Sequence, residues 1–112
     1  MLVFFKRSIG VDPLASYFTL YTSGHGVATV VYGGRNGARV HGFDLGENQL
    51  RRLRRLLRHT RLQNATIRNP SLYTYWVTTD NGAHRLQQGA VPRSARRLLG
   101  ALTAIADANH LF

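Results

Sequence analysis

Five arginines within one predicted helix give this chain its most distinctive chemistry. Segment 50–61 mixes leucines with basic residues, and at about 100° per residue its leucines share one helical face: Leu50, Leu53, Leu56 and Leu57. The arginines spread over the other face: Arg51, Arg52, Arg54, Arg55 and Arg58. Guanidinium groups pair with phosphates and carboxylates in bidentate fashion, so this face would suit a polyanion or an acidic protein. The solvated back of an ordinary sheet-covering helix shows the same spacing, so both interpretations stay open.

The overall charge extends the same theme. The chain has fifteen Lys and Arg residues against five Asp and Glu, a formal net charge of +10 at pH 7. Such an excess attracts acidic protein surfaces and nucleic acids over long range. We find no helix-turn-helix pattern, zinc-finger spacing or RNP-type motif, and no aromatic residue interrupts the arginine segment. We therefore expect a protein partner first and a nucleic acid as the alternative.

Residues that could support catalysis or bind a metal are sparse. The five histidines are scattered and show no metal-binding spacing: His25, His41, His59, His84 and His110. The five acids show no paired-carboxylate spacing: Asp12, Asp44, Glu47, Asp80 and Asp107. Nucleophile-elbow and P-loop motifs are also missing from the sequence. We therefore expect a non-enzymatic protein with no catalytic residues, no cofactor and no metal.

Length and composition indicate the kind of domain that positions these residues. With 112 residues, 44% of them hydrophobic, the chain is predicted to form a single domain over 1–112 with a real core. The absence of cysteine excludes a disulfide framework and any thiolate metal site. The apolar block 2–5 is far too short for a signal segment or a membrane span. We expect a cytoplasmic protein that does not bind membranes.

Local patterns predict an antiparallel meander, a helix, a β-hairpin and a second helix. The expected strands cover 2–7, 16–22, 27–32, 38–43, 72–79 and 83–88, with turns at 23–26, 33–37 and 80–82 and a loop at 8–15. Asp44 and Glu47 have capping-box spacing, which places the first helix at about 45–59. The second helix is expected at about 92–108, with Pro92 near its start and Asn109 as its C-cap.

These elements predict an α+β two-layer sandwich in which both helices pack on one face of the sheet. In segment 72–79 one row of alternating side chains must then face outward. Either Tyr73, Tyr75 and Val77 or the row that contains Trp76 would be exposed, and exposed aromatics could form a recognition surface. Ordinary cross-strand packing is the alternative explanation.

A family resemblance adds to this reading. It rests on Phe43-Asp44-Leu45, the leucines of the first helix, the run from Tyr73 to Thr79 with Gly82, and Gly89-Ala90-Val91-Pro92 followed by Leu98, Leu99 and Leu102. Over roughly 16–106 this order resembles small actinobacterial proteins and is similar to the emfourin group, proteinaceous inhibitors of thermolysin-like metalloproteases. The resemblance implies a protein-binding module that inhibits a metalloprotease. It identifies no inhibitory residue in this chain. An exposed strand edge could pair two copies of the chain, so a monomer and a homodimer both stay open.

Overall fold

The computed structural model describes residues 1–9, 16–31, 37–65 and 71–111. Its elements in chain order are β1 (Val3–Ile9), β2 (Tyr17–Leu20), β3 (His25–Val31), β4 (Ala38–Asp44), α1 (Glu47–His59), β5 (Tyr73–Thr79), β6 (Gly82–Gln87), a short 3-10 turn η2 (Arg93–Ala95) and α2 (Arg96–Ala108). All neighbouring strands are antiparallel in one six-stranded sheet of order β4-β3-β2-β1-β5-β6. The predicted α+β class and order of elements are confirmed.

Two tight turns follow from glycines in the left-handed region. Gly24, in the β2–β3 turn, has a φ of 91°, and Gly82, after Asp80 and Asn81, has a φ of 117°. Side chains rarely tolerate such angles, so glycine is the natural residue at both positions. The predicted hairpin between β5 and β6 is therefore confirmed. Most of the predicted turn at 33–37 and most of the predicted loop at 8–15 lie outside the described residues. Where the two predictions can be compared with the structure, β1 continues to Ile9, so the first strand is longer and the loop begins later than expected.

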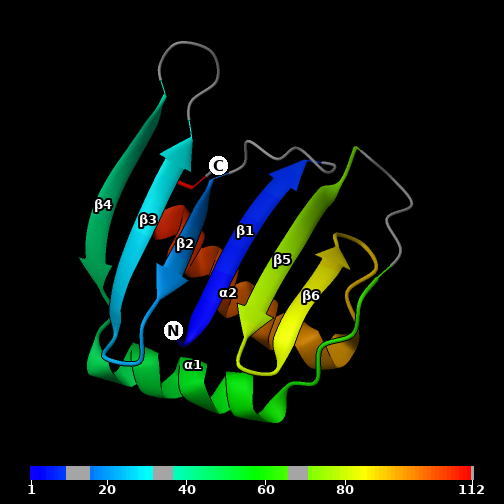
Figure 1. Ribbon diagram of the computed structural model, residues 1–112. Coiled ribbons are helices and arrows are strands. Elements are labelled where there is room, and N and C mark those ends of the chain that lie inside the picture. Colours follow the sequence, from blue (N-terminus) through cyan, green and yellow to red (C-terminus); the bar gives the residue numbers. More distant parts are fainter. Residues whose placement is uncertain (10–15, 32–36, 66–70, 112) are drawn as a thin grey trace.

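The core lies between one face of the sheet and α2, which passes behind the sheet in the view of Figure 1. Phe5 and Phe18 pack across the β1–β2 pair as tilted rings with their centroids 5.5 Å apart. From α2, Leu98 and Leu102 are almost completely buried against this layer. Each such side chain contributes about 1.5–3 kcal/mol by leaving water, so this layer dominates the stability of the fold.

Helix α1 runs along the ends of the strands (Figure 1). Its Leu53 is 2% exposed and joins the same core, while its Leu50 lies beside Gly24 of the β2–β3 turn. The expectation that both helices would cover one face is therefore not confirmed in its detail. What the structure shows is a six-stranded antiparallel sheet with two helices.

The start of α1 corrects the predicted capping box. Gly46 is the N-cap and provides no side-chain hydrogen bond to the helix. Asp44 instead ends β4, where its carboxylate lies 3.1 Å from Nδ1 of His25. The cross-strand pairing of Asp44 with His25 positions this carboxylate at the sheet, three residues before the helix begins at Glu47. The predicted C-cap is confirmed, because Asn109 ends α2 and its side-chain amide donates to the Ile105 carbonyl.

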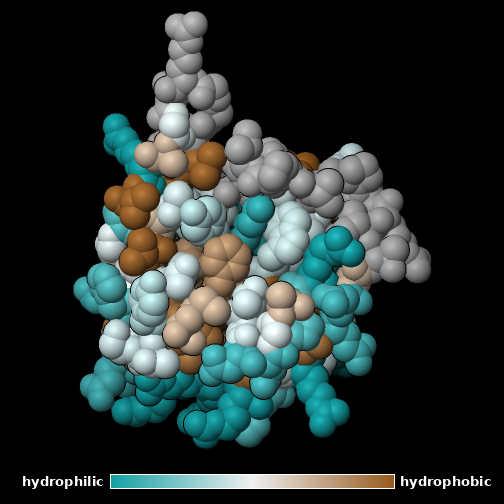
Figure 2. Space-filling model, viewed as in Figure 1, coloured by the Kyte–Doolittle hydropathy of each residue, from teal (hydrophilic) through white to brown (hydrophobic). Residues whose placement is uncertain are grey.

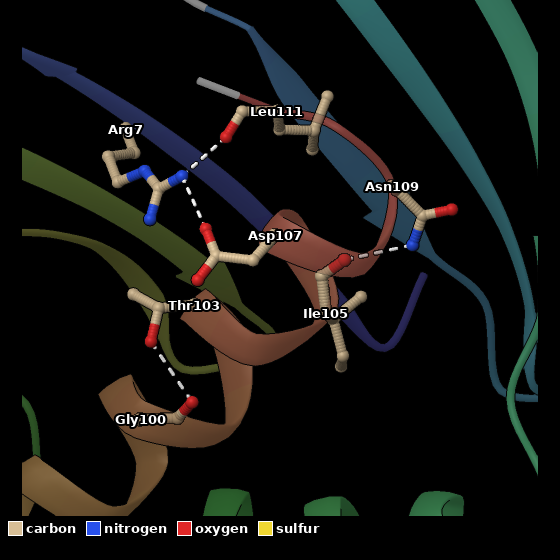
Figure 3. Close-up of polar contacts among 7 residues, drawn as sticks. All are labelled: Arg7, Gly100, Thr103, Ile105, Asp107, Asn109 and Leu111. Carbon is tan, nitrogen blue, oxygen red and sulfur yellow. Dashed lines mark hydrogen bonds and ion pairs between the residues drawn. The ribbon is translucent and has the colours of Figure 1, made fainter.

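The end of α2 is fastened to β1 by a single arginine (Figure 3). The Arg7 guanidinium donates to the Asp107 carboxylate at 2.9 Å and to the Leu111 carbonyl, and it lies over the ring of Tyr73. This contact joins residues 100 positions apart and fixes the helix against the centre of the sheet. No helix in the described part of the chain is both long and apolar enough to cross a membrane.

Candidate binding surfaces on helix α1 and the open sheet face

The arginine face of α1 points away from the core. All five predicted arginines are exposed, whereas Leu53 on the opposite side of the helix is buried. Two of them have partners: Arg51 lies 3.7 Å from the Glu47 carboxylate, and Arg54 donates to the Thr22 carbonyl in the β2–β3 turn. Exposed pairs of the first kind contribute little stability, so Arg51 remains available to an anion.

A shallow hollow of about 460 Å³ brings four of the predicted arginines together. Arg51, Arg54, Arg55 and Arg58 line it, and Arg52 does not. The wall also includes Glu47 and His59. A ligand along this hollow would therefore meet four guanidinium groups on successive turns of one helix.

The acids do little to neutralise this surface. Among the described carboxylates, Asp107 pairs with Arg7, Asp44 with His25, and Glu47 with Arg51. Within the described residues no ion pair joins a carboxylate to Arg52, Arg55 or Arg58. The uncompensated charge on α1 attracts anions over long range.

A second surface lies on the face of the sheet that α2 leaves uncovered. The strand register sets Tyr17 beside Lys6, Lys6 beside Trp76, and Trp76 beside Arg85, in one row across four strands. Phe4 lies in the next row, with its ring centroid 5.4 Å from that of Tyr17. Figure 2 shows this face: mainly tan and pale residues cover the middle of the sheet, brown ones lie toward β3 and β4 at the left, and teal residues follow α1 below.

The structure decides which row of segment 72–79 faces outward. Tyr75 and Val77 are 8% and 1% exposed and belong to the core, so the row that contains Trp76 lies on the other face of the sheet. Within that row Trp76 is half-buried and Thr74 is fully buried. Sequence reasoning did not single out Phe4, Lys6 or Tyr17 for this surface. The alternation along β1 of buried Val3 and Phe5 with Phe4 and Lys6 indicates that the latter two lie on the opposite face of the sheet. Only the strand register places Lys6 beside Tyr17 and Trp76.

The two edges of the sheet differ. On β6, the Arg85 N–H donates to Asn64 Oδ1 at 2.9 Å, and the Ala65 N–H donates to the Arg85 carbonyl at 2.8 Å. The segment after α1 therefore protects this edge. Strand β4 is the opposite edge: among the described strands it pairs with β3 alone, and its Val40 is 66% exposed. Unprotected edges of this kind can pair with another chain.

Among the residues that the structure describes, no three His, Asp or Glu side chains gather into a metal-binding cluster. Burial raises the pKa of Tyr75, but this tyrosine lies on the core side of the sheet. Comparisons with family models, curated proteins and solved structures find no match to the chain. Function must therefore be inferred from the two surfaces themselves.

Proposed function

We propose that this chain is a non-enzymatic protein-binding module whose docking surface is the open face of the sheet. The observation that carries the proposal is the row Tyr17, Lys6, Trp76 and Arg85, with Phe4 beside it. Aromatic and arginine side chains supply much of the binding energy in protein interfaces. The basic members of the row and the arginines of α1 favour a partner with an acidic surface.

The resemblance to the emfourin group suggests which partner to test first. We propose a thermolysin-like metalloprotease, a cytoplasmic location, and a monomer or a homodimer paired through β4. The uncovered β4 edge supports the homodimer. Light scattering of the purified protein distinguishes the two oligomeric states.

An inhibition assay tests this function directly. Purified protein in micromolar excess should lower the activity of at least one member of a panel of thermolysin-like proteases. The Trp76→Ala variant should inhibit at least about tenfold more weakly, because it removes the large aromatic side chain at the centre of the row. Ala104→Ser, an exposed change on α2, is the control. If every protease stays fully active, the inhibitor proposal is wrong.

A single-stranded nucleic acid is the second candidate, and one specific observation favours it. The uncovered face of the sheet, which carries the row around Trp76, adjoins helix α1 at one end of the sheet (Figures 1 and 2). Bases stack on aromatic rings while arginines contact phosphates, which is the usual combination in single-strand binding. This arrangement supplies aromatic residues that the arginine segment itself does not contain.

Salt dependence separates the two candidates. The affinity for a fluorescent oligothymidine should fall steeply as the salt concentration rises. In a plot of the logarithm of the association constant against the logarithm of the salt concentration, each contacted phosphate should contribute a slope of about −0.7. Changing Arg51, Arg54, Arg55 and Arg58 together to glutamine should reduce both the affinity and this slope. If oligothymidine binding is unaffected by the quadruple change, the arginine face does not bind nucleic acid. A protein interface anchored by the aromatic residues of the sheet face would lose less affinity over the same salt range, because its anchors are uncharged and only its basic residues are screened.

A further inference from the structure

A third feature is a hollow where the stretch 57–63, the β5–β6 hairpin and α2 meet. It has a volume of about 420 Å³ and lies between the end of α1, the segment after it, the β5–β6 turn and α2. Arg58 from α1 and Arg61 just after it line one part of the wall, and Thr79 and Asn81 from the turn line another. Small-molecule sites commonly have volumes of about 300–1,000 Å³. The hollow is therefore large enough for a small ligand.

The polar part of the wall is suited to an anion. Two guanidinium groups, two threonine hydroxyls and two side-chain amides line the hollow, and its described lining contains no carboxylate. Arginine recognises planar, two-oxygen anions in bidentate fashion. A carboxylate would meet donors here and no like charge from the lining.

His84 adds hydrogen-bonding capacity that the fold leaves unused. It belongs to the same wall, and its Nδ1 atom is buried with no hydrogen-bond partner among the described residues. A buried polar atom without a partner costs free energy. In the tautomer that carries the proton on Nδ1, a small turn of the ring toward a bound carboxylate would supply the missing partner.

The remaining wall of the hollow is apolar and favours a ligand whose anionic group is attached to an apolar part. Leu57, Leu62 and Leu98 contribute it, and Leu98 belongs to the core of the protein. A bare inorganic phosphate would gain nothing from these side chains and would have to lose water beside them. An apolar group attached to the anion would bury its surface favourably.

We propose that this hollow binds a carboxylate carried on an apolar body. Two sources share this chemistry: a free small carboxylic acid, and the C-terminal carboxylate of a peptide that ends in an apolar residue. The inference does not rest on the proposed function: the hollow lies at the end of α1 and not in the row around Trp76, it shares only Arg58 with the arginine-lined hollow of α1, and its test needs no partner protein.

Titration of the isotope-labelled protein, followed by NMR, tests the proposal. Hexanoate should shift the signals of His84, Asn81 and Leu62 in a saturable way, with a dissociation constant of roughly 1 mM or below. The neutral isostere hexanamide and inorganic phosphate should each bind at least about tenfold more weakly. If hexanamide or phosphate binds as well as hexanoate, or if no probe binds, the proposal is overturned.

Arginine variants separate a built site from general charge attraction. The Arg58→Gln and Arg61→Gln double variant should weaken hexanoate binding by at least about tenfold. The matched control is Arg93→Gln combined with Arg97→Gln, which removes the same charge from exposed positions outside the hollow. Equal losses in both pairs would overturn the proposal. Unchanged amide spectra elsewhere in each variant show that the fold is intact.

A peptide arm identifies the source of the carboxylate. Acetyl-Gly-Gly-Leu with a free C-terminus is compared with its C-terminal amide and with hexanoate. Tighter binding of the free peptide than of hexanoate assigns the site to a peptide C-terminus, and the reverse order assigns it to a small acid. Equal binding of the free peptide and its amide contradicts carboxylate recognition altogether.

Discussion

The ammonium nitrogen of Lys6 lies 4.9 Å from the ring centroid of Trp76, on the face of the sheet that α2 leaves uncovered. The two residues are directly opposite in the β1–β5 register, although they are far apart in the sequence. A cation over an aromatic face orders both side chains. It therefore holds Trp76 in a defined position at the centre of the proposed docking row.

Replacing Lys6 tests this relationship. Lys6→Met removes the cation but keeps the apolar stem, and we expect a loss of about 0.5–1 kcal/mol in the free energy of unfolding. Trp76 is the only tryptophan, so its fluorescence emission reports the change directly. Lys6→Arg keeps a cation over the ring and should preserve both stability and emission. If arginine and methionine behave alike in chemical denaturation and fluorescence, the cation contributes nothing.

Gly26 allows the ring of Phe43 to pack against the β3 backbone. A Cβ atom on Gly26 would lie only 2.2 Å from Phe43 Cζ, so we expect Gly26→Ala to cost about 1–3 kcal/mol through overpacking. Adding Phe43→Leu should restore part of the loss, because it removes the clashing ring. Thermal and chemical unfolding measure both effects. Two additive losses would show that the ring contact is not the cause.

Gly100, in the middle of α2, is the opposite case. A Cβ atom there meets nothing within 4 Å, and the glycine is exposed. We expect Gly100→Ala to raise the free energy of unfolding by about 1 kcal/mol, since alanine is the better helix former. The same denaturation experiment serves for both glycines. A loss of stability at this position would mean that the backbone of α2 needs glycine for another reason.

Local chemistry made several elements predictable from the sequence. Asp80, Asn81 and Gly82 define a hairpin wherever they stand between two strand patterns, and the leucines of α2 show their period without any knowledge of the sheet. The exposed arginine face of α1 follows from the same period. Each of these features depends on neighbours within a few residues.

Features that depend on distant partners were not predictable. Asp44 has the right spacing for a capping box, but its pairing with His25 across β3 and β4 decides its role. Likewise, β1 lies between β2 and β5, and no local pattern indicates this. The row around Trp76 and the hollow near His84 both arise from such pairings.

The contact between Arg7 and Asp107 should contribute unequally from its two sides. Asp107 is 68% exposed and therefore screened by solvent, so we expect Asp107→Asn to cost only about 0.5–1 kcal/mol. Arg7 is 12% exposed and also bonds the Leu111 carbonyl, so Arg7→Met should cost about 2–3 kcal/mol. A double-mutant cycle measured by urea denaturation should give a coupling no larger than the Asp107 effect. A coupling near the full Arg7 effect would show that the ion pair is the dominant contact.

Tyr75 should make stability depend on pH in the alkaline range. Burial raises its pKa above the ordinary value of 10.0, against the opposing effect of the nearby Arg7 charge. Above pH 10 the unfolded chain therefore releases the phenolic proton while the folded protein keeps it, which favours unfolding. The stability associated with this proton is complete below pH 10 and is lost as the pH rises through the raised pKa.

Tyr75→Phe removes this proton and should make the alkaline decline in stability shallower. Urea denaturation of both proteins across pH 8 to 11 provides the comparison, and ultraviolet absorbance of tyrosinate should show that the variant lacks one late-titrating group. The difference in the free energy of unfolding between the two proteins should be constant below pH 9. Above pH 10 it should shift in favour of the variant. Parallel curves over the whole range would mean that Tyr75 ionises as readily in the folded protein as in the unfolded chain, contrary to its burial in the core.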